Sequence, residues 1–257
     1  MGKVVQVLAL IPEFKNCTSV FFQDWSSSSG APPVNVIPKL VYGKPYIHET
    51  LNIPGIRPLT FRVQPTAFFQ TNSPGCEILY GKIIDLCRQV APPSDPFTVL
   101  DICCGTGTIG ISVAAAFPSA KVFGVDIVEA AIQDAHHNQK LNQVDHAVFF
   151  ADDARVAIRQ LTAQLQPSEK CVAILDPPRG GLHKKVIKAL LECPSIDRII
   201  YVACNPAGLV DFIPLFCSSM QVTECHVIDM FPQTQQMEMI VCLDRVPSPT
   251  SKELPAH

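Results

Sequence analysis

The stretch of residues 97–110 limits most strongly what this chain can fold into. It opens with a short, nearly continuous apolar run, as a parallel strand buried on both of its faces requires. Gly105 and Gly107 then allow the backbone to turn sharply, and from Ile109 apolar residues continue at helical spacing. In an open α/β sheet, ligands bind just outside the carboxyl ends of the strands. The stretch therefore predicts a buried strand, a ligand-facing turn and a helix.

Asp101 lies near the carboxyl end of the predicted strand, ahead of the two glycines. Gly110 completes a Gly-x-x-Gly spacing after Gly107, but the acid comes before the glycines. This order is expected of a nucleoside-binding methyltransferase loop rather than of a pyrophosphate loop. An ordinary tight turn between a strand and a helix is the alternative interpretation of so short a motif.

Composition and charge limit the class of protein further. With 257 residues, 47% of them hydrophobic, the chain can bury a substantial core as one large domain or a domain with an extension. We expect no membrane span and no signal peptide. The net charge of −3 argues against nucleic-acid binding through overall charge. Eleven cysteines without a Cys-x-x-Cys pair favour a reducing intracellular compartment and argue against disulfides or a metal. The first residues are not an Arg- and Ser-rich transit peptide, so we expect the cytosol or nucleus rather than the mitochondrion.

Strand and helix patterns alternate regularly after this stretch, which predicts an α/β fold with a mostly parallel, Rossmann-like sheet. The last two strands follow one another without a helix, so one antiparallel strand is expected near the end. Ahead of the stretch we expect a helix over residues 73–90, with Ser73 as N-cap and Pro74 in the first helical position. The other expected strands are 121–126, 147–151, 171–176, 198–203, 222–229 and 238–243, and the other expected helices are 129–141, 154–165, 184–191 and 209–217.

We expect three parts along the chain. Residues 1–65 form a small N-terminal β-rich extension, and residues 66–246 form the α/β domain. Residues 247–257, rich in proline, serine and threonine, form a disordered tail. The strand signals of the extension are at 4–10, 20–22 and 59–63.

Each strand of the repeat ends in polar residues, which the sheet would present to a ligand. Asp126 can accept two hydrogen bonds from a ribose diol, or it can cap the next helix. Of Asp152 and Asp153, one can bind an adenine amino group while the other caps a helix, and the sequence does not distinguish them.

Asp176 opens the loop Asp176-Pro177-Pro178-Arg179, whose prolines fix the backbone. Such a loop is expected where a flat nucleobase is held against a methyl donor, and a rigid surface turn is the alternative. A basic patch follows, which is either a phosphate contact or a solvated helix face. It consists of Arg179, His183, Lys184, Lys185 and Lys188.

Cys204 ends the fifth strand of the repeat, where a thiolate would face the ligand. Because cysteine attacks as the thiolate, we expect the site to lower the pKa of this thiol, for example through Arg179. Glu238 begins the last strand, where a buried carboxylate is costly unless it is functional or paired. Partial burial would raise its pKa toward neutrality and suit it to act as a base, and a salt-bridged edge residue is the alternative.

Taken in order along residues 68–245, these motifs resemble the RNA uracil-5-methyltransferase family, most closely its eukaryotic tRNA branch. The resemblance implies a class I S-adenosylmethionine-dependent methyltransferase fold for residues 66–246, behind an extension that is the remnant of a central domain. It implies S-adenosylmethionine as donor and 5-methyluridine, in the tRNA T-loop, as product. The motifs are Phe69-Gln70-Thr71-Asn72, residues 101–110, Leu175-Asp176-Pro177-Pro178-Arg179, Tyr201-Val202-Ala203-Cys204-Asn205-Pro206, and Phe231-Pro232-Gln233-Thr234 with Glu238.

The resemblance also implies roles for single residues. Cys204 would be the nucleophile and Glu238 the base. Ala203 stands where the family usually has serine, and Gln235-Gln236-Met237 stands where Pro-His is common. The family usually carries an RNA-binding domain ahead of the extension, which we do not find in this sequence, so we expect binding of a tRNA T-arm to need it. The residues implied to line the cofactor or the target base are Gln70, Cys103, Thr108, Asp126 and Asp176.

The chemistry explains why a thiol and a carboxylate are needed. Uracil carbon 5 is too weak a nucleophile to take a methyl group, but thiolate addition at carbon 6 makes an enolate that can, and a base then removes the carbon 5 proton. Two other interpretations stay open. A cytosine-5 enzyme would be expected to carry a Pro-Cys dipeptide where Asp176-Pro177-Pro178 stands. A non-catalytic RNA-binding or RNA-folding protein that retains the fold is disfavoured by the presence of Cys204 and Glu238, and favoured by the net negative charge and by the basic domain that we do not find.

Overall fold

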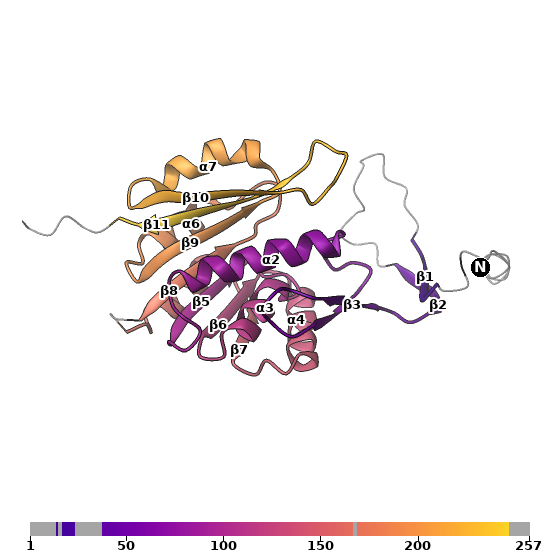
Figure 1. Cartoon of the computed structure of the whole chain (residues 1–257). Helices are drawn as coiled ribbons and strands as arrows, with labels where there is room; N and C mark the ends of the chain where they lie inside the picture. Colours follow the sequence, from indigo (N-terminus) through magenta and orange to yellow (C-terminus); the bar gives the residue numbers. More distant parts are fainter. Residues whose placement is uncertain (1–13, 15–16, 24–37, 167–168, 247–257) are drawn as a thin grey trace, which may run out of the picture.

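The computed structural model describes residues 14, 17–23, 38–166 and 169–246. A seven-stranded sheet lies at its centre, with the strand order β10-β11-β9-β8-β5-β6-β7 (Figure 1). Within this sheet β11 alone runs against the other strands, because it pairs antiparallel with both β9 and β10. The fold prediction is therefore confirmed. The strands are β5 (Phe97–Ile102), β6 (Lys121–Asp126), β7 (Ala147–Ala151), β8 (Lys170–Leu175), β9 (Ile196–Ala203), β10 (Met220–Ile228) and β11 (Glu238–Arg245).

Helices cover both faces of the sheet, and each face has its own hydrophobic core. One core includes buried residues of α2 (Ser73–Arg88), α3 (Thr108–Ala116) and α4 (Glu129–Leu141). The other includes residues of α5 (Ala154–Thr162), α6 (Lys184–Leu191) and α7 (Leu209–Phe216), which follows the short 3-10 helix η2 (Pro206–Gly208). Every residue of β5 is buried, as a strand covered on both faces requires.

Two small hairpins precede the central sheet. β1 (Ser19–Phe22) pairs with β2 (Lys39–Gly43), and β3 (Ile47–Leu51) pairs with β4 (Leu59–Val63). β1 and β4 were predicted, whereas β2 and β3 were not, because their residues are mostly exposed and carry little apolar signal. The predicted strand at 4–10 and the predicted tail at 247–257 lie outside the described residues.

The hairpin of β3 and β4 packs on the same core as α2. Leu51, Leu59 and Phe61 are fully buried and belong to the core cluster that contains α2 and α3. The hydrophobic core therefore extends across residue 65. The division of the chain at that residue stays a prediction.

The start of α2 differs from the prediction by one residue. Asn72, not Ser73, is the N-cap, and its side chain accepts a hydrogen bond of 3.0 Å from the Gly75 amide. The Ser73 hydroxyl donates instead to Glu49 at 2.6 Å. Asparagine reaches the third helical amide as well as serine does, so the tertiary contact with Glu49 decides between the two.

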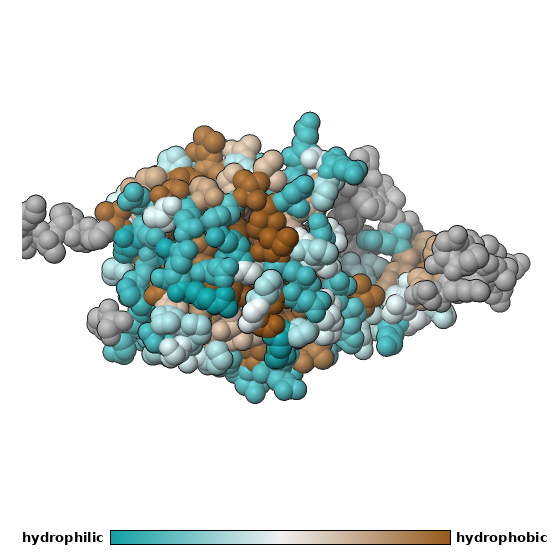
Figure 2. Space-filling view, in the orientation of Figure 1, coloured by the Kyte–Doolittle hydropathy of each residue, from teal (hydrophilic) through white to brown (hydrophobic). Residues whose placement is uncertain are grey.

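Figure 2 shows one face of the molecule, on which hydrophilic residues surround smaller hydrophobic patches. The edge strand β10 contributes exposed polar side chains such as Gln221 and Thr223, which discourage pairing with another strand. None of the described helices combines the length and the apolar character that a membrane crossing needs.

Candidate active site

The parallel strands end at one edge of the sheet and gather the predicted residues there. Ile102 of β5 pairs with Leu175 of β8, so Cys103 and Asp176, which follow them, lie at the same level. The Asp176 amide donates to the Ile102 carbonyl at 3.4 Å. This edge is where an open α/β sheet binds its ligand.

The glycine-rich turn after β5 adopts the conformation that its sequence predicts. Gly105 and Gly107 have φ angles of 53° and 78°, and Cys103 has a φ of 63° although it carries a side chain. Asp101 accepts a hydrogen bond of 2.8 Å from the Gly110 amide through Oδ2, while its buried Oδ1 has no partner in the described part of the chain. Burial raises the pKa of Asp101 to about 7.

Gly124 of β6, two residues before Asp126, has a packing role. A Cβ at Gly124 would lie 2.2 Å from the Phe149 ring, and one at Gly107 or Gly110 would lie 3.1 or 3.2 Å from the same ring. Phe149 of β7 thus packs against three glycines. Phe149 is remote in sequence from these glycines, so no local sequence pattern predicts the contact.

Asp126 and Asp153 hold main-chain groups at the ends of their strands. Asp126 accepts hydrogen bonds from the amides of Gly105 and Val128, both at 2.9 Å. Asp153 is the N-cap of α5 and forms an ion pair with Arg155. Asp152 is half-buried, and among the described residues its side chain accepts a hydrogen bond only from the Asp153 amide, at 2.7 Å. The structure thus identifies Asp153 as the helix cap, and the binding of adenine by Asp152 stays a prediction.

Cys204 and Glu238 lie at the ends of neighbouring strands. Ala203 of β9 pairs with Met239 of β11, so the register sets Cys204 beside Glu238. Glu238 is 3% exposed, and its Oε2 is buried without a hydrogen-bond partner in the described part of the chain. Burial raises the pKa of Glu238 to about 7, against the opposing effect of Arg179. The raised pKa agrees with the prediction, and the described structure contains no salt bridge to Glu238.

Asp176 completes a cluster of acids at this edge. Burial, together with the charges of Glu238 and Asp101, raises its pKa to about 8. The expectation of a lowered Cys204 pKa is wrong for this structure. Burial and the nearby Glu238 and Asp176 raise the pKa of the thiol more than Arg179 lowers it. The two carboxylates oppose a neighbouring thiolate only while they are charged.

A depression beside Cys204 has walls from two loops and a helix. Arg179 stands at it and donates a hydrogen bond of 2.9 Å to the Gln236 side chain, which links the loops after β8 and before β11. The sequence assigned no role here to η2 and α7. The only sequence feature that could have indicated a role for η2 and α7 was their position directly after Cys204. The lining includes Pro177, Arg179, Tyr201, Cys204, Leu209 and Phe212.

Gln70 and Thr108 are both associated with α2. Gln70 is 5% exposed in the loop before α2, and its side chain makes no hydrogen bond within the described residues. Thr108 is the first residue of α3, and its hydroxyl lies 2.9 Å from that of Tyr80. No hydrogen bond in the described structure joins Gln70 to Cys204 or Asp176.

The predicted basic patch is an exposed helix start. His183 is the N-cap of α6, and its Nδ1 accepts a hydrogen bond of 3.2 Å from the Lys185 amide. Lys184 and Lys185 are exposed, whereas Lys188 pairs with Glu192 at 3.6 Å. Its contact with phosphate stays a prediction. The described residues contain no group of three His, Cys, Asp or Glu side chains placed to hold a metal.

Comparison with known proteins places this arrangement in a family. Residues 35–246 match the family described as tRNA (Uracil-5-)-methyltransferase. The human tRNA (uracil-5-)-methyltransferase homolog A is 38% identical over 219 residues, a match to 81% of this chain and 33% of the human protein. The mouse homolog B is 33% identical over 240 residues, 89% of this chain and 46% of its own length. The chain thus spans between a third and a half of these relatives.

Solved structures agree with the sequence match. The Pyrococcus abyssi tRNA (uracil-54, C5)-methyltransferase, determined in complex with S-adenosyl-L-homocysteine, has a TM-score of 0.64 and 27% identity, covering 88% of this chain and 50% of that one. An S-adenosylmethionine-dependent methyltransferase of Agrobacterium tumefaciens, at 15% identity and a TM-score of 0.59, shares the fold. The resemblance inferred from the motifs is confirmed. Because the family match spans residues 35–246 and the human relative covers 81% of the chain, the chain belongs to the tRNA (uracil-5-)-methyltransferase family.

Proposed function

We propose that this protein is an S-adenosylmethionine-dependent RNA uracil-5-methyltransferase that forms 5-methyluridine in the T-loop of tRNA. The observation that carries the proposal is the strand register that sets Cys204 beside the buried Glu238, whose Oε2 has no partner among the described residues. Membership of the family and the name of the Pyrococcus relative, which acts on uracil 54 of tRNA, support the substrate. We also propose that RNA binding needs a domain ahead of the described hairpins.

The turn at the end of β5 fits a nucleoside cofactor. A Cβ at Gly105 would meet no atom within 4 Å, so the backbone is open to a ligand there. The residues proposed to hold the cofactor are Cys103, Thr108 and Asp126, with Asp152 at the adenine, and the half-buried Asp126 and Asp152 each keep lone pairs free. S-adenosylmethionine, when bound, supplies an electrophilic methyl group.

Cys204 begins the proposed reaction on the base. Its thiolate adds to carbon 6 of uracil, forming a carbon–sulfur bond and moving the electron pair of the double bond toward carbon 5 and the carbonyl oxygen. Carbon 5 is then nucleophilic enough to accept a methyl group. Arg179 favours the thiolate, and at neutral pH protonation of the nearby acids weakens their opposition.

Glu238 ends the reaction by taking the proton from carbon 5. The electron pair of that bond restores the double bond, and the bond from carbon 6 to Cys204 breaks. A carboxylate with a pKa of about 7 is suited to this role, because it is a stronger base than an ordinary glutamate and is still partly ionised at neutral pH. Its buried Oε2 has no competing partner in the described structure.

Asp176 and Gln70 are proposed to hold the edge of the base. With a pKa of about 8, Asp176 carries a proton at neutral pH and can donate a hydrogen bond to a uracil carbonyl. The Gln70 amide is buried and makes no hydrogen bond within the described residues, so it has both a donor and an acceptor to offer. The target uridine must first leave its stack in the loop.

Trapping the covalent step tests the proposal. The protein is incubated with S-adenosylmethionine and a T-arm RNA that carries 5-fluorouridine, and a denaturing gel then separates protein from adduct. Fluorine does not leave as a proton does, so the adduct should persist. We expect a shifted band with the wild type and with Cys217→Ala, an exposed cysteine at the end of α7, and none with Cys204→Ala.

An adduct of equal yield in Cys204→Ala would refute the assigned nucleophile. If no variant forms an adduct, the experiment is repeated with an amino-terminal RNA-binding domain joined to the chain. Persistent failure there would refute uracil-5 chemistry.

A further inference from the structure

Asn138 of α4 and Asn142, the C-cap of that helix, bind the outer edge of β4. Asn138 accepts a hydrogen bond of 2.7 Å from the Arg62 amide and donates to the Arg62 carbonyl at 3.4 Å. Asn142 accepts one of 2.9 Å from the Thr60 amide and donates to the Thr60 carbonyl at 2.7 Å. Both side chains are buried, at 0% and 2% exposure. Each amide thus pairs with one residue of β4 as a neighbouring strand would.

These side chains supply hydrogen-bond partners for main-chain groups of β4 that do not pair with β3. β4 pairs only with β3 in the described structure, so alternate main-chain groups of β4 have no partner within the sheet. An asparagine side chain offers both an acceptor and two donors, which matches a main-chain amide and carbonyl. Arg62 strengthens the same contact through its ion pair with Asp134 of α4, at 2.7 Å. The hairpin is therefore fastened to α4 along its length.

Asn138 differs from Asn142 in one further contact. Its Nδ2 also donates to the Thr106 carbonyl at 3.2 Å, whereas the Nδ2 of Asn142 donates to the Asn138 carbonyl at 2.8 Å. Thr106 lies between Gly105 and Gly107, the two glycines with positive φ in the turn after β5. A hydrogen bond to that carbonyl fixes the orientation of the peptide between Thr106 and Gly107. Glycine is otherwise the residue whose backbone is most free to rotate.

We propose that Asn138 is a positioning residue, which ties the β3–β4 hairpin to the glycine-rich turn and holds that turn in the shape that binds the cofactor. The inference rests on the proposed function only in taking S-adenosylmethionine as the ligand of the turn. Asn138 acts through the Thr106 carbonyl and has no assigned contact with the cofactor itself. A consequence is that the hairpin, which precedes the sheet in sequence, contributes to cofactor affinity.

The matched pair of asparagines supplies the test. Asn138→Ala and Asn142→Ala each remove one bridge to β4, but only Asn138→Ala removes the bond to the turn. Calorimetric titration with S-adenosylmethionine should show an increase in Kd of about tenfold for Asn138→Ala and of less than about twofold for Asn142→Ala. Thermal unfolding should show similar losses for both variants, because the bridges to β4 are alike. No RNA is required, so a failure of methylation does not affect the outcome.

Hydrogen exchange measures the same difference without any ligand. The amides of residues 104–108 should exchange faster in Asn138→Ala than in Asn142→Ala, while those of β4 should be affected alike. Equal changes in the two variants, in Kd and in exchange of the turn, would overturn the proposal.

If Asn138→Ala does not fold, Asn138→Asp takes its place. Aspartate keeps the acceptor for the Arg62 amide but loses the donor to the Arg62 and Thr106 carbonyls, so β4 keeps its 2.7 Å bond while the turn loses its support. Unchanged exchange of residues 104–108 in that variant would overturn the proposal as well.

Discussion

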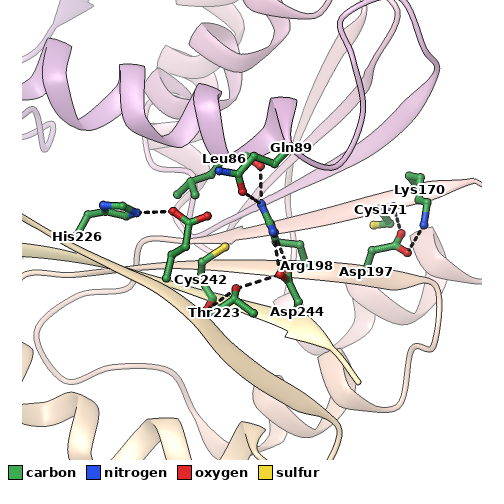
Figure 3. A network of polar contacts seen from close by, with 11 residues as sticks. Leu86, Gln89, Lys170, Cys171, Asp197, Arg198, Thr223, His226, Cys242 and Asp244 are labelled. Atoms are coloured by element: carbon green, nitrogen blue, oxygen red, sulfur yellow. Dashed lines mark hydrogen bonds and ion pairs between the residues drawn. The ribbon is translucent and has the colours of Figure 1, made fainter. Parts of the chain in front are cut away.

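The two ends of the central sheet differ in whether their charged side chains form ion pairs. At the end where the parallel strands begin, Arg198 is paired with Asp244 and Lys170 with Asp197, as Figure 3 shows. At the end where they finish, the acids Asp101, Asp176 and Glu238 have no ion-pair partner in the described part of the chain. The first arrangement holds elements together, and the second keeps groups available for a ligand.

Arg198 is the centre of the paired end. Its guanidinium donates two hydrogen bonds to Asp244, at 2.6 and 2.8 Å, and others to the Leu86 carbonyl and the Gln89 side chain at the end of α2. Thr223 of β10 also donates to Asp244 at 3.0 Å. Burial acts to raise the pKa of Asp244, but these hydrogen bonds outweigh it and hold the pKa below its usual range. One buried cation thus connects α2, β9 and β11 and, through Asp244, β10.

At the other end, the effect of burial on the carboxyl pKa values is the larger one. Asp176 and Glu238 have pKa values raised to about 8 and about 7 because burial is not offset by hydrogen bonds from partners. A folded-state pKa above the ordinary carboxyl value of about 4 means that ionising the group opposes folding. The comparison indicates that the acids at this end lower the stability of the fold, because they are buried and unpaired and have pKa values near neutrality. Such groups are common at functional sites.

Glu238→Gln should have the largest effect of the substitutions that break this comparison. The amide keeps the shape of the side chain but removes the base, so turnover should fall by about 10²–10⁴-fold. Thermal stability should be unchanged or higher, because a buried unpartnered carboxylate is lost. With unmodified RNA and S-adenosylmethionine, a covalent adduct should accumulate on a denaturing gel, since the proton at carbon 5 is no longer removed.

Glu224→Gln is the matched control for that experiment. Glu224 lies on β10, pairs with His226 at 2.8 Å and has no role in the proposed chemistry. Its turnover should equal that of the wild type. Undiminished turnover in Glu238→Gln would show that another group removes the proton.

Arg198→Met should have the second largest effect, at the opposite end of the sheet. Removing the buried cation leaves Asp244 without its ion-pair partner and the Leu86 carbonyl without its donor, which should lower the free energy of unfolding by about 3 kcal/mol. Urea unfolding measures the change. The Kd for S-adenosylmethionine should stay within about twofold of the wild-type value.

The double variant Arg198→Met with Asp244→Leu sharpens the result. If the loss arises from the uncompensated carboxylate, the double variant should be more stable than Arg198→Met alone. A double variant that is less stable would show that the guanidinium contributes mainly through its contacts with α2.

Asp176→Asn should have the smallest effect on stability and the opposite sign. The unfolded carboxyl loses its proton near pH 4, whereas the folded one keeps it until about pH 8, so the wild type loses stability as pH rises through this range. Asp176→Asn does not lose stability in this way, because its side chain does not ionise. It should be about 1–2 kcal/mol more stable than the wild type at pH 8, a value reduced by solvent access, and equal to it near pH 4.

Asp244→Asn gives the contrasting pH profile. Because its folded pKa is lowered, Asp244 contributes stability above pH 4 that is lost as the pH falls through the folded pKa. Asp244→Asn should therefore destabilise the protein at pH 8 and have little effect at low pH. Unfolding curves of the two variants with the same sign at pH 8 would contradict the division between the two ends.

Much of the fold followed from local patterns. The strands at 97–102, 121–126 and 147–151 were predicted with the bounds observed, because their apolar runs and flanking turns are continuous in sequence. Helix α5 ends at Thr162 rather than 165, and β2 and β3 escaped prediction, since exposed strands and helix ends carry weak signals. The candidate residues Cys204, Glu238 and Asp176 were identified by type and position, and their roles stay proposals.

The sequence by itself determined the succession of strands and helices, the family, and which residue types stand at the strand ends, because periodicity and short motifs are local properties. Only the tertiary structure decided which acids are paired. It also decided that Asp153 is the cap, that Gly124 makes room for Phe149, and that the Cys204 pKa is raised rather than lowered. Asn138 carries no local signal at all, since its contacts with Arg62 and Thr106 span 76 and 32 residues. Burial and charge depend on such long-range neighbours, which a reading of local pattern does not contain.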